Sequence, residues 1–473
     1  MFKLLLIYLL WNKCAAAFSN EVGDCYANNS NPYLLFGTKT AYTRVYSSPP
    51  EKILPEGWAP FLLWGVVRHG TRNPFVSELS SLRQLRRLRD QILQNEEFYR
   101  SNVELCPEDL ENLKSWTITL HHNDTGLLTA QGYKEMYTLG ERVRQRFSQI
   151  FKKEYVADKF LIQSTNSLRS RSSAEAFVKG AFQVNNTKNM TSINDGLLKA
   201  YRNCTFWKLL YKTDRKFRHE YSHLMHMKVM KELSQNISKR LGFFFSLESS
   251  DVWTMYLMCR YDRAFNQSVH YVSPWCGVFT IDQLKILEFK EDLYYYYKHG
   301  FGLPINLKLG CPLLRDLILK FNGAVNDTRQ SVSTVYFTTH GMFERLLSRL
   351  GFFNDTQPLK STNITDERRL WRTSRIPFGA NLFAVLYRST MDTSQGYRVV
   401  FYLNEEILPV DGCEEGFCLW DDIKNRFYNI TNIETCNLND CYIGSAVSIS
   451  KQTTFYIYCM LFATIIFVFF NAT

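Results

Sequence analysis

The sequence contains no internal repeat and no low-complexity segment, which excludes solenoids and propellers. It also lacks a P-loop and a cluster of carboxylates, so we predict neither a nucleotide cofactor nor a metal ion. Its 12 cysteines include no CxxC pair, which argues against a zinc site. With 45% hydrophobic and 21% charged residues among 473, the chain is typical of a globular protein with a large core.

The N-terminal segment has the pattern of a secretory signal peptide. A short basic start at Lys3 precedes the apolar residues 4–11, and residues 15–17 are small, as at a cleavage site. We therefore predict that residues 1–17 are removed on secretion. The alternative is a buried N-terminal strand.

The C-terminal end has the pattern of a glycosylphosphatidylinositol (GPI) attachment signal. Residues 455–470 carry no charge, but these 16 fall short of the roughly 20 that span a bilayer, and no Lys or Arg follows them. An eight-residue spacer, 447–454, separates them from three small residues that begin at Gly444. We predict GPI attachment at Gly444 and removal of residues 445–473. The alternative is a C-terminal transmembrane anchor.

Ten cysteines remain once Cys14 in the predicted signal and Cys459 in the predicted tail are set aside. An even number in a secreted chain predicts five disulfides. Sequence spacing alone does not fix their connectivity. Two pairs are close enough to bridge locally: Cys413 with Cys418, and Cys436 with Cys441.

Eleven N-x-S/T sequons lie between the two predicted terminal signals, which predicts a heavily glycosylated surface. The acceptor residues are Asn28, Asn123, Asn185, Asn189, Asn203, Asn236, Asn266, Asn326, Asn354, Asn363 and Asn429. Together with the disulfides, they predict a protein of the secretory pathway that is GPI-anchored at the extracellular face of the plasma membrane. The alternatives are a secreted protein and one of the endoplasmic reticulum lumen.

The net charge of +11 falls to +8 without the three lysines of the two terminal signals. Excess positive charge raises the local concentration of anions, so we expect an acidic partner. We expect no nucleic acid, because the chain is secreted and disulfide-bonded, and predict a small polyanion instead. The densest basic stretch, Arg83 to Arg89, lies on an amphipathic helix, where its charges either face a ligand or form a solvated face.

Apolar runs typical of buried strands alternate with helical patterns along much of the chain. The predicted strands are 61–67, 159–163, 335–338, 381–387 and 398–402, and the predicted helices are 76–95, 128–152, 170–184 and 343–350. This alternation predicts an α/β fold with a central sheet flanked by helices. Residues 186–326 are mostly helical and rich in sequons, so we predict a smaller α domain inserted into an α/β domain formed by 18–185 and 327–444.

The first predicted strand leads directly into Arg68-His69-Gly70-Thr71-Arg72-Asn73-Pro74. Ligands of open α/β sheets bind beyond the carboxyl ends of strands, where this segment lies. Arg68 and Arg72 flank the histidine and can hold a phosphate by bidentate, charge-assisted hydrogen bonds. Gly70 lets the backbone approach the ligand closely. His69 is then placed to attack phosphorus and to form a covalent phosphohistidine.

This segment matches the RHGxRxP signature of the histidine acid phosphatases. The resemblance extends over nearly the whole mature chain, to the branch of multiple inositol polyphosphate phosphatases, which are secretory-pathway phytases. It implies a mixed sheet with an added α domain, and a nucleophilic histidine surrounded by three arginines and a second histidine. The implied roles are His69 as nucleophile, with Arg68, Arg72, Arg169 and His340 as phosphate ligands. Arg171 is the alternative to Arg169.

The chain departs from the family pattern next to the second histidine. The family has His-Asp there, or His-Ala-Glu in the inositol-phosphate branch, and the acid donates a proton to the leaving group. Here Gly341 and Met342 follow His340, and neither side chain can donate a proton. An alternative alignment without a gap places Thr339 at the histidine position.

Glu344 is the nearest carboxyl group to His340. It lies four residues further on, which places both on one face if a helix starts there. Glu344 is therefore the candidate proton donor, a role that is typically worth 10²–10⁴-fold in rate. The alternative is a solvated helix residue that pairs with Arg345 or Arg349.

Together these features predict a phosphomonoesterase that hydrolyses inositol polyphosphates such as phytate through phospho-His69. One alternative is an acid phosphatase of broader specificity. Another is a surface protein with weakened catalysis that captures phosphorylated ligands with the same arginines. We expect His121 and His122, in a polar stretch before Asn123, to be loop residues rather than ligands.

Overall fold

The structure is a computed structural model, and it describes residues 25–29, 32–46, 56–98, 103–151, 155–268, 271–391, 396–431, 436–439 and 441–442. The predicted signal peptide (1–17), the predicted attachment residue Gly444 and the predicted tail (445–473) lie outside these residues. Within the described ranges, no helix combines the length and the hydropathy needed to cross a membrane.

The chain divides into two compact units. The first comprises Met1–Ala41, Asn73–Gly126 and Met225–Glu288, and the second comprises Tyr42–Arg72, Leu127–Leu224 and Phe289–Thr473. The predicted helical insertion, 186–326, contributes to both units, so the domain boundaries inferred from the sequence stay a prediction. The long helices of the first unit are α2 (Val76–Phe98), α3 (Pro107–Ser115), α9 (Lys228–Arg240) and α10 (Ser249–Phe265).

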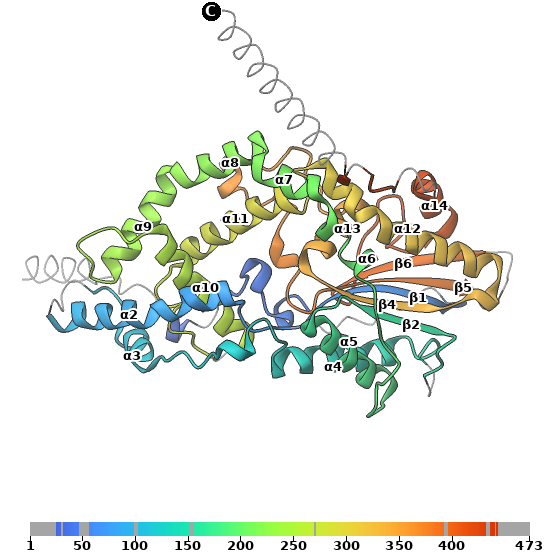
Figure 1. Cartoon of the computed structure of the whole chain (residues 1–473), viewed down its shortest axis with the longest axis horizontal. Coiled ribbons are helices and arrows are strands. Elements are labelled where there is room, and N and C mark those ends of the chain that lie inside the picture. Colours follow the sequence, from blue (N-terminus) through green and yellow to red (C-terminus); the bar gives the residue numbers. More distant parts are fainter. Residues whose placement is uncertain are drawn as a thin grey trace, which may run out of the picture. The chain divides into compact units, whose positions relative to one another are not determined.

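A single mixed sheet forms the centre of the second unit (Figure 1). Its strands are β1 (Trp58–Arg68), β2 (Phe160–Ser164), β3 (Ser192–Ile193), β4 (Ser333–Thr338), β5 (Asn381–Ser389), β6 (Tyr397–Leu403), β7 (Glu406–Ile407) and β8 (Cys418–Leu419). They follow the order β3-β2-β4-β1-β5-β6-β7, with β8 paired to β6. Strands β1 to β4 pair in parallel, whereas β5 to β8 add antiparallel strands. The predicted central mixed sheet is thereby confirmed.

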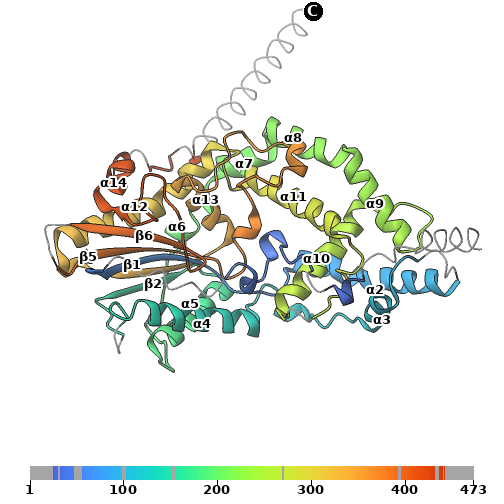
Figure 2. The ribbon, with the colours of Figure 1, turned by 180° about the vertical axis from the view of Figure 1, so that it is seen from behind.

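Helices cover both faces of this sheet, as Figures 1 and 2 show. The helices of the second unit and its borders are α4 (Ala130–Arg146), α5 (Leu168–Phe182), α6 (Asp195–Leu198), α7 (Thr205–Thr213), α8 (Arg215–His226), α11 (Ile281–Lys298), α12 (Pro304–Asn326), α13 (His340–Leu350) and α14 (Trp420–Arg426). Leu63 and Val67 of β1 share a core with α4 and α5. Leu62 and Trp64 share the opposite core with α12, α13 and α14. Successive strand residues point to opposite faces, so the apolar run of β1 is buried on both sides, as predicted.

Helix α2 of the first unit is the predicted amphipathic helix. Four of its leucines are buried, Leu79, Leu82, Leu85 and Leu88, while Arg83, Arg86 and Arg87 are exposed. Arg86 donates a hydrogen bond of 2.9 Å to the carbonyl of Ile118, and Arg89 one of 2.6 Å to the carbonyl of Trp116. Part of the basic stretch therefore holds the neighbouring chain segment, and the rest forms a solvated face.

Five disulfides join the ten cysteines between the predicted terminal signals, as predicted. The bonds are Cys25–Cys106, Cys204–Cys441, Cys259–Cys276, Cys311–Cys436 and Cys413–Cys418. The local bond predicted for Cys413 is confirmed. The predicted local bond between Cys436 and Cys441 is wrong, because each of these residues bonds to a helical region 125 or 237 residues earlier in the chain.

Most of the predicted glycosylation acceptors lie on the surface. The exposed ones are Asn123, Asn185, Asn189, Asn203, Asn236, Asn266, Asn326, Asn354 and Asn429. Asn363 is partly buried, and its side-chain oxygen accepts a hydrogen bond of 2.8 Å from the backbone N–H of Lys360. Exposure makes the nine residues accessible to a glycosyltransferase, and their modification stays a prediction.

Candidate active site

The carboxyl ends of three parallel strands meet at one edge of the sheet (Figure 1). The register aligns Arg68 at the end of β1 with Thr338 at the end of β4. β1 continues into His69, β4 into His340 at the start of α13, and β2 into the loop that carries Arg169 at the start of α5. Parallel pairing therefore places the predicted site residues from three distant parts of the sequence at the same edge.

His69 is buried, with 4% of its surface exposed. Its Nδ1 lies 2.9 Å from the carbonyl oxygen of Gly70. Because a carbonyl only accepts, Nδ1 must carry the proton, which leaves the lone pair on Nε2. Burial, together with the positive charges of Arg169, Arg68 and Arg72, lowers the pKa of His69 well below its ordinary value. The imidazole is thus held neutral, in the tautomer that a nucleophile requires.

Arg68 is a buried cation beside this histidine. Its Nη1 donates a hydrogen bond of 2.7 Å to the carbonyl of Ile376, and its guanidinium lies 4.6 Å from the centre of the Phe378 ring. Burial and the nearby charge of Arg72 lower the pKa of Arg68 to about 9, although Tyr295 and Glu344 oppose the shift. A bound dianion would relieve this desolvated positive charge, as expected at a phosphate site.

Arg72 and Arg169 complete the positive surroundings of His69. Arg72 is buried, with 5% of its surface exposed, and Arg169 is partly buried in the first turn of α5. Both lower the pKa of His69. Arg171, the alternative to Arg169, is exposed to solvent. The geometry therefore favours Arg169 as the third arginine of the site.

The loop that carries His69 is fixed by helices α4 and α5. A Cβ atom at Gly70 would lie 2.4 Å from the carbonyl oxygen of Gly132 in α4, so only glycine permits this approach. The Glu135 carboxylate accepts hydrogen bonds of 2.8 Å from both the N–H and the hydroxyl of Thr71. Ser173 of α5 accepts one of 3.2 Å from the N–H of Gly70. Packing against the helices thus adds a second reason for the glycine, beside the ligand approach expected from the sequence.

His340 and Glu344 lie on one face of α13, as expected from their spacing. The Nδ1 atom of His340 is 3.2 Å from Oε2 of Glu344. Glu344 is fully buried, so the alternative of a solvated helix residue is wrong. Burial raises the pKa of this carboxyl well above its usual value, against the opposing charges of Arg345 and Arg68. Thr339 is instead the N-terminal cap position of α13, and its hydroxyl lies 2.9 Å from the hydroxyl of Tyr201.

Sequence reasoning missed a third member of this cluster. His299 follows α11 and is 8% exposed. Its Nδ1 lies 2.7 Å from the same Oε2 atom of Glu344. Burial, with the charges of Arg345, Lys298 and His340, lowers the pKa of His299 well below its ordinary value. No local motif marks His299, because it lies 45 residues from Glu344 in the sequence.

The prediction of no metal ion also overlooked a motif. His219-Glu220-Tyr221-Ser222-His223 on α8 has the HExxH pattern of zinc proteases. Its imidazoles are parallel, with ring centres 6.1 Å apart. However, Glu220 accepts hydrogen bonds of 2.8 and 2.7 Å from the N–H and the hydroxyl of Ser361, and within the described ranges no third ligand group joins the pair. The motif therefore holds the loop at Ser361.

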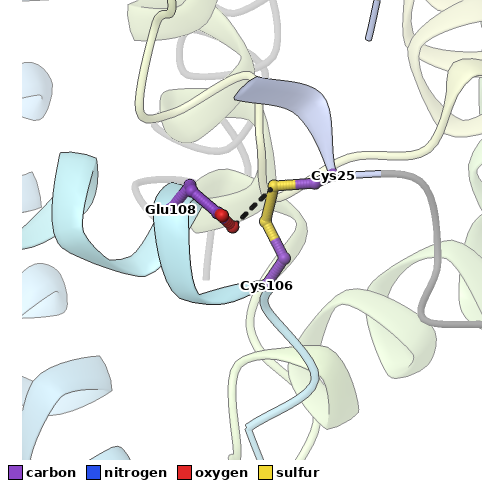
Figure 3. A group of neighbouring side chains, drawn as sticks. All are labelled: Cys25, Cys106 and Glu108. Atoms are coloured by element: carbon purple, nitrogen blue, oxygen red, sulfur yellow. Dashed lines mark hydrogen bonds between the residues drawn. A yellow bond between two sulfur atoms is a disulfide. The ribbon is translucent and has the colours of Figure 1, made fainter. Parts of the chain in front are cut away.

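Two groups in the described part of the chain bring three potential metal ligands together. In the first, Glu108 lies beside the Cys25–Cys106 disulfide, with Oε2 3.5 Å from the Cys25 sulfur (Figure 3). The disulfide leaves no thiolate to bind a metal. The second group is the cluster of His299, His340 and Glu344, where the nearby charges of Arg345 and Arg68 oppose a divalent cation. His121 and His122, in the first unit, are exposed.

Comparison with known proteins shows the family to which the chain belongs. The family model of the histidine phosphatase superfamily, branch 2, matches residues 63–404. This range includes His69, His299, His340 and Glu344. The chain belongs to this superfamily. It is 32% identical to multiple inositol polyphosphate phosphatase 1 of Drosophila melanogaster over 88% of this chain and 89% of the relative. The human protein of the same name is 29% identical, over 91% and 93%.

A solved structure shares the fold of this phosphatase. The crystal structure of the phytase from D. castellii superposes with a TM-score of 0.65 and 14% identity, and the match covers 82% of this chain and 83% of that one. This superposition confirms the predicted α/β fold, and the family match with the 32% identical relative confirms the predicted phosphatase activity. At 14% identity the superposition shows a shared fold and nothing about the substrate.

Proposed function

We propose that this phosphatase hydrolyses inositol polyphosphates at the cell surface through a phosphohistidine on His69. The observation that carries the proposal is the neutral, buried His69, whose Nε2 lone pair is available while Arg68, Arg72 and Arg169 surround it. The substrate class is supported by the 32% identical relative, which is named for inositol polyphosphates.

In the first step, Nε2 of His69 attacks phosphorus, the new N–P bond forms and the ester P–O bond breaks. The three arginines neutralise the charge of the transferring group, which is where most of the catalysis of phosphoryl transfer lies. The leaving inositol oxygen takes up a proton. Water then attacks the phosphohistidine, and phosphate and free His69 are released.

Further positive charge extends from the site and favours a substrate with several phosphates. Lys199 is buried, and its amine lies 3.4 Å from the Asp195 carboxylate. Burial lowers the pKa of Lys199, with contributions from the charges of Arg202 and Arg169. The charge of Arg169 thus acts on Lys199, and we expect Lys199 to contact a neighbouring phosphate on the same inositol ring.

The location proposed is the extracellular face of the plasma membrane, through a GPI anchor at Gly444. The five disulfides require an oxidising compartment. Release of the protein from intact cells by a phosphatidylinositol-specific phospholipase would support the anchor. Retention of the protein on the treated cells would favour a transmembrane anchor.

The central experiment measures phosphate release from phytate by the purified protein and by its His69→Ala variant. We expect release by the natural protein only, and a labelled phosphohistidine after rapid quenching. Equal release from simple phosphomonoesters and phytate would favour the broader acid phosphatase. If both proteins bound phytate and neither released phosphate, the result would favour a relative that captures phosphorylated ligands without hydrolysing them.

A further inference from the structure

Glu344 has the chemistry of the missing acid but not its position. Its side chain is fully buried, so it has no surface with which to touch a leaving group. His340 and His299 pack against it and are 9% and 8% exposed, and the Nε2 atom of His340 is itself buried. Both imidazoles place Nδ1 against the same carboxylate oxygen, at 3.2 and 2.7 Å, which turns each Nε2 atom away from Glu344.

We propose that Glu344, His340 and His299 form a proton relay that protonates the leaving oxygen in place of the missing acid. The inference rests on the proposed function of this site. His340 passes the proton, Glu344 is its source, and His299 is a positioning residue that holds Oε2 of Glu344.

The relay balances in one concerted shift. Before transfer, Oε2–H of neutral Glu344 donates to Nδ1 of His340, while Nε2 of His340 carries its own proton toward the leaving oxygen. As the ester P–O bond breaks, Nε2–H gives its proton to that oxygen and Nδ1 receives the proton of Glu344. His340 stays neutral and changes tautomer, and Glu344 becomes a carboxylate. Nδ1–H of His299 then donates to this carboxylate. Proton uptake after product release restores the starting state.

The charges around Glu344 are suited to such a change of state. Arg345 and Arg68 face it and favour the carboxylate, whereas Glu291 and Asp292 favour the neutral acid. Burial raises the pKa of Glu344 well above its usual value. The acid therefore stays protonated until negative charge develops on the leaving oxygen.

Gly341 explains how His299 reaches this position. A Cβ atom there would lie 2.7 Å from Cε1 and 2.8 Å from Nε2 of His299. The family acid starts from this position or the next one, and here Met342 points into the apolar core instead. The absence of a side chain at residue 341 therefore coincides with the presence of the His299 imidazole, which follows α11.

The test uses leaving groups of different basicity. An inositol alkoxide needs a proton to leave, whereas p-nitrophenolate leaves without one. The readout is the ratio of phytate turnover to the first-turnover burst of p-nitrophenolate from p-nitrophenyl phosphate. We expect His299→Phe and Glu344→Gln to lower this ratio about a hundredfold, within the usual worth of general acid catalysis.

Matched variants separate a relay from a structural role. His299→Asn keeps an N–H donor near the position of Nδ1, so we expect it to recover at least ten times the ratio of His299→Phe. His122→Gln, at an exposed loop histidine, serves as control and should leave the ratio unchanged. Equal loss of both reactions in His299→Phe, or equal ratios in all variants, would overturn the relay. Absence of phytate hydrolysis and of a burst in the natural protein would instead overturn the proposed function itself.

Discussion

Adding a single methyl group at Gly341 tests the contact on which the cluster depends. In Gly341→Ala the new Cβ would lie 2.7 Å from Cε1 of His299, 2.8 Å from Nε2 and 3.1 Å from Nη1 of Arg345. Real Cβ atoms do not approach that closely, so the imidazole must move. The ring is held by Glu344 and stacked on Tyr295, with ring centres 5.0 Å apart, so movement strains its 2.7 Å contact with the carboxylate.

The expected free-energy change is the difference between two effects. Overpacking of a buried site costs about 1–3 kcal/mol. Replacing glycine by alanine in a helix contributes up to about 1 kcal/mol of stability in return. We therefore expect Gly341→Ala to destabilise the protein by about 1 kcal/mol. In a His299→Ala background the clash with the imidazole is absent and only the 3.1 Å contact with Nη1 of Arg345 remains. The same substitution should then stabilise the protein by a few tenths of a kcal/mol to about 1 kcal/mol.

Thermal unfolding of the four proteins in this cycle gives the coupling between the two positions. The midpoint should fall by about 1–2 °C for Gly341→Ala alone, since the shift per kcal/mol decreases with chain length, and should rise in the His299→Ala background. If Gly341→Ala raised the midpoint equally in both backgrounds, His299 would not occupy the space next to Gly341.

Three further predictions concern the site and its support. In steady-state kinetics, Arg169→Ala should lower kcat/KM for phytate about 10–100-fold, because a charged hydrogen bond to the substrate is lost. The matched control Arg171→Ala should change kcat/KM less than about threefold. The neutral form of His69 is the nucleophile and burial among the arginines lowers its pKa, so activity should persist below pH 6.5; an acidic limb of kcat/KM at or above 6.5, corrected for substrate ionisation, would contradict this. Removing Cys311–Cys436, which closes a span of 125 residues, should lower the free energy of unfolding by about 5 kcal/mol. Removing Cys413–Cys418, with a span of 5, should lower it by about 2 kcal/mol. Equal decreases in the thermal unfolding midpoint would refute this loop-length argument.

Local patterns predicted the elements that form the sheet and place His69. The apolar run at 61–67 corresponds to β1, and the segment directly after it carries the motif whose histidine the structure buries among arginines. These features depend on residues that are neighbours in sequence, or on the period of one strand or helix, so the chain order alone reveals them. The exposure of Arg171 and the partial burial of Arg169 likewise follow from the period of α5.

The disulfide pairing could not be predicted in the same way. Cys436 and Cys441 are five residues apart, yet each bonds to a different helical region of the second unit. Proximity in sequence sets only the entropy of closing a loop, while the path of the folded chain decides which sulfurs meet. For Cys436 the path depends on how α12, which carries Cys311, packs on the sheet, and cysteine spacing contains no information about that packing.

The same limit applies to the proton donor. From the sequence, Glu344 and His340 form a pair on one helix, and a carboxyl group beside a histidine resembles a direct proton donor. The structure buries that carboxyl completely and places His299, the residue after α11, against it. In the proposed relay this buried acid acts through His340, its neighbour on α13, while His299, which no local motif marks, holds the carboxylate. In the sequence, Gly341 marks the absence of the family's acid. In the structure, its missing side chain leaves the space that the His299 imidazole occupies.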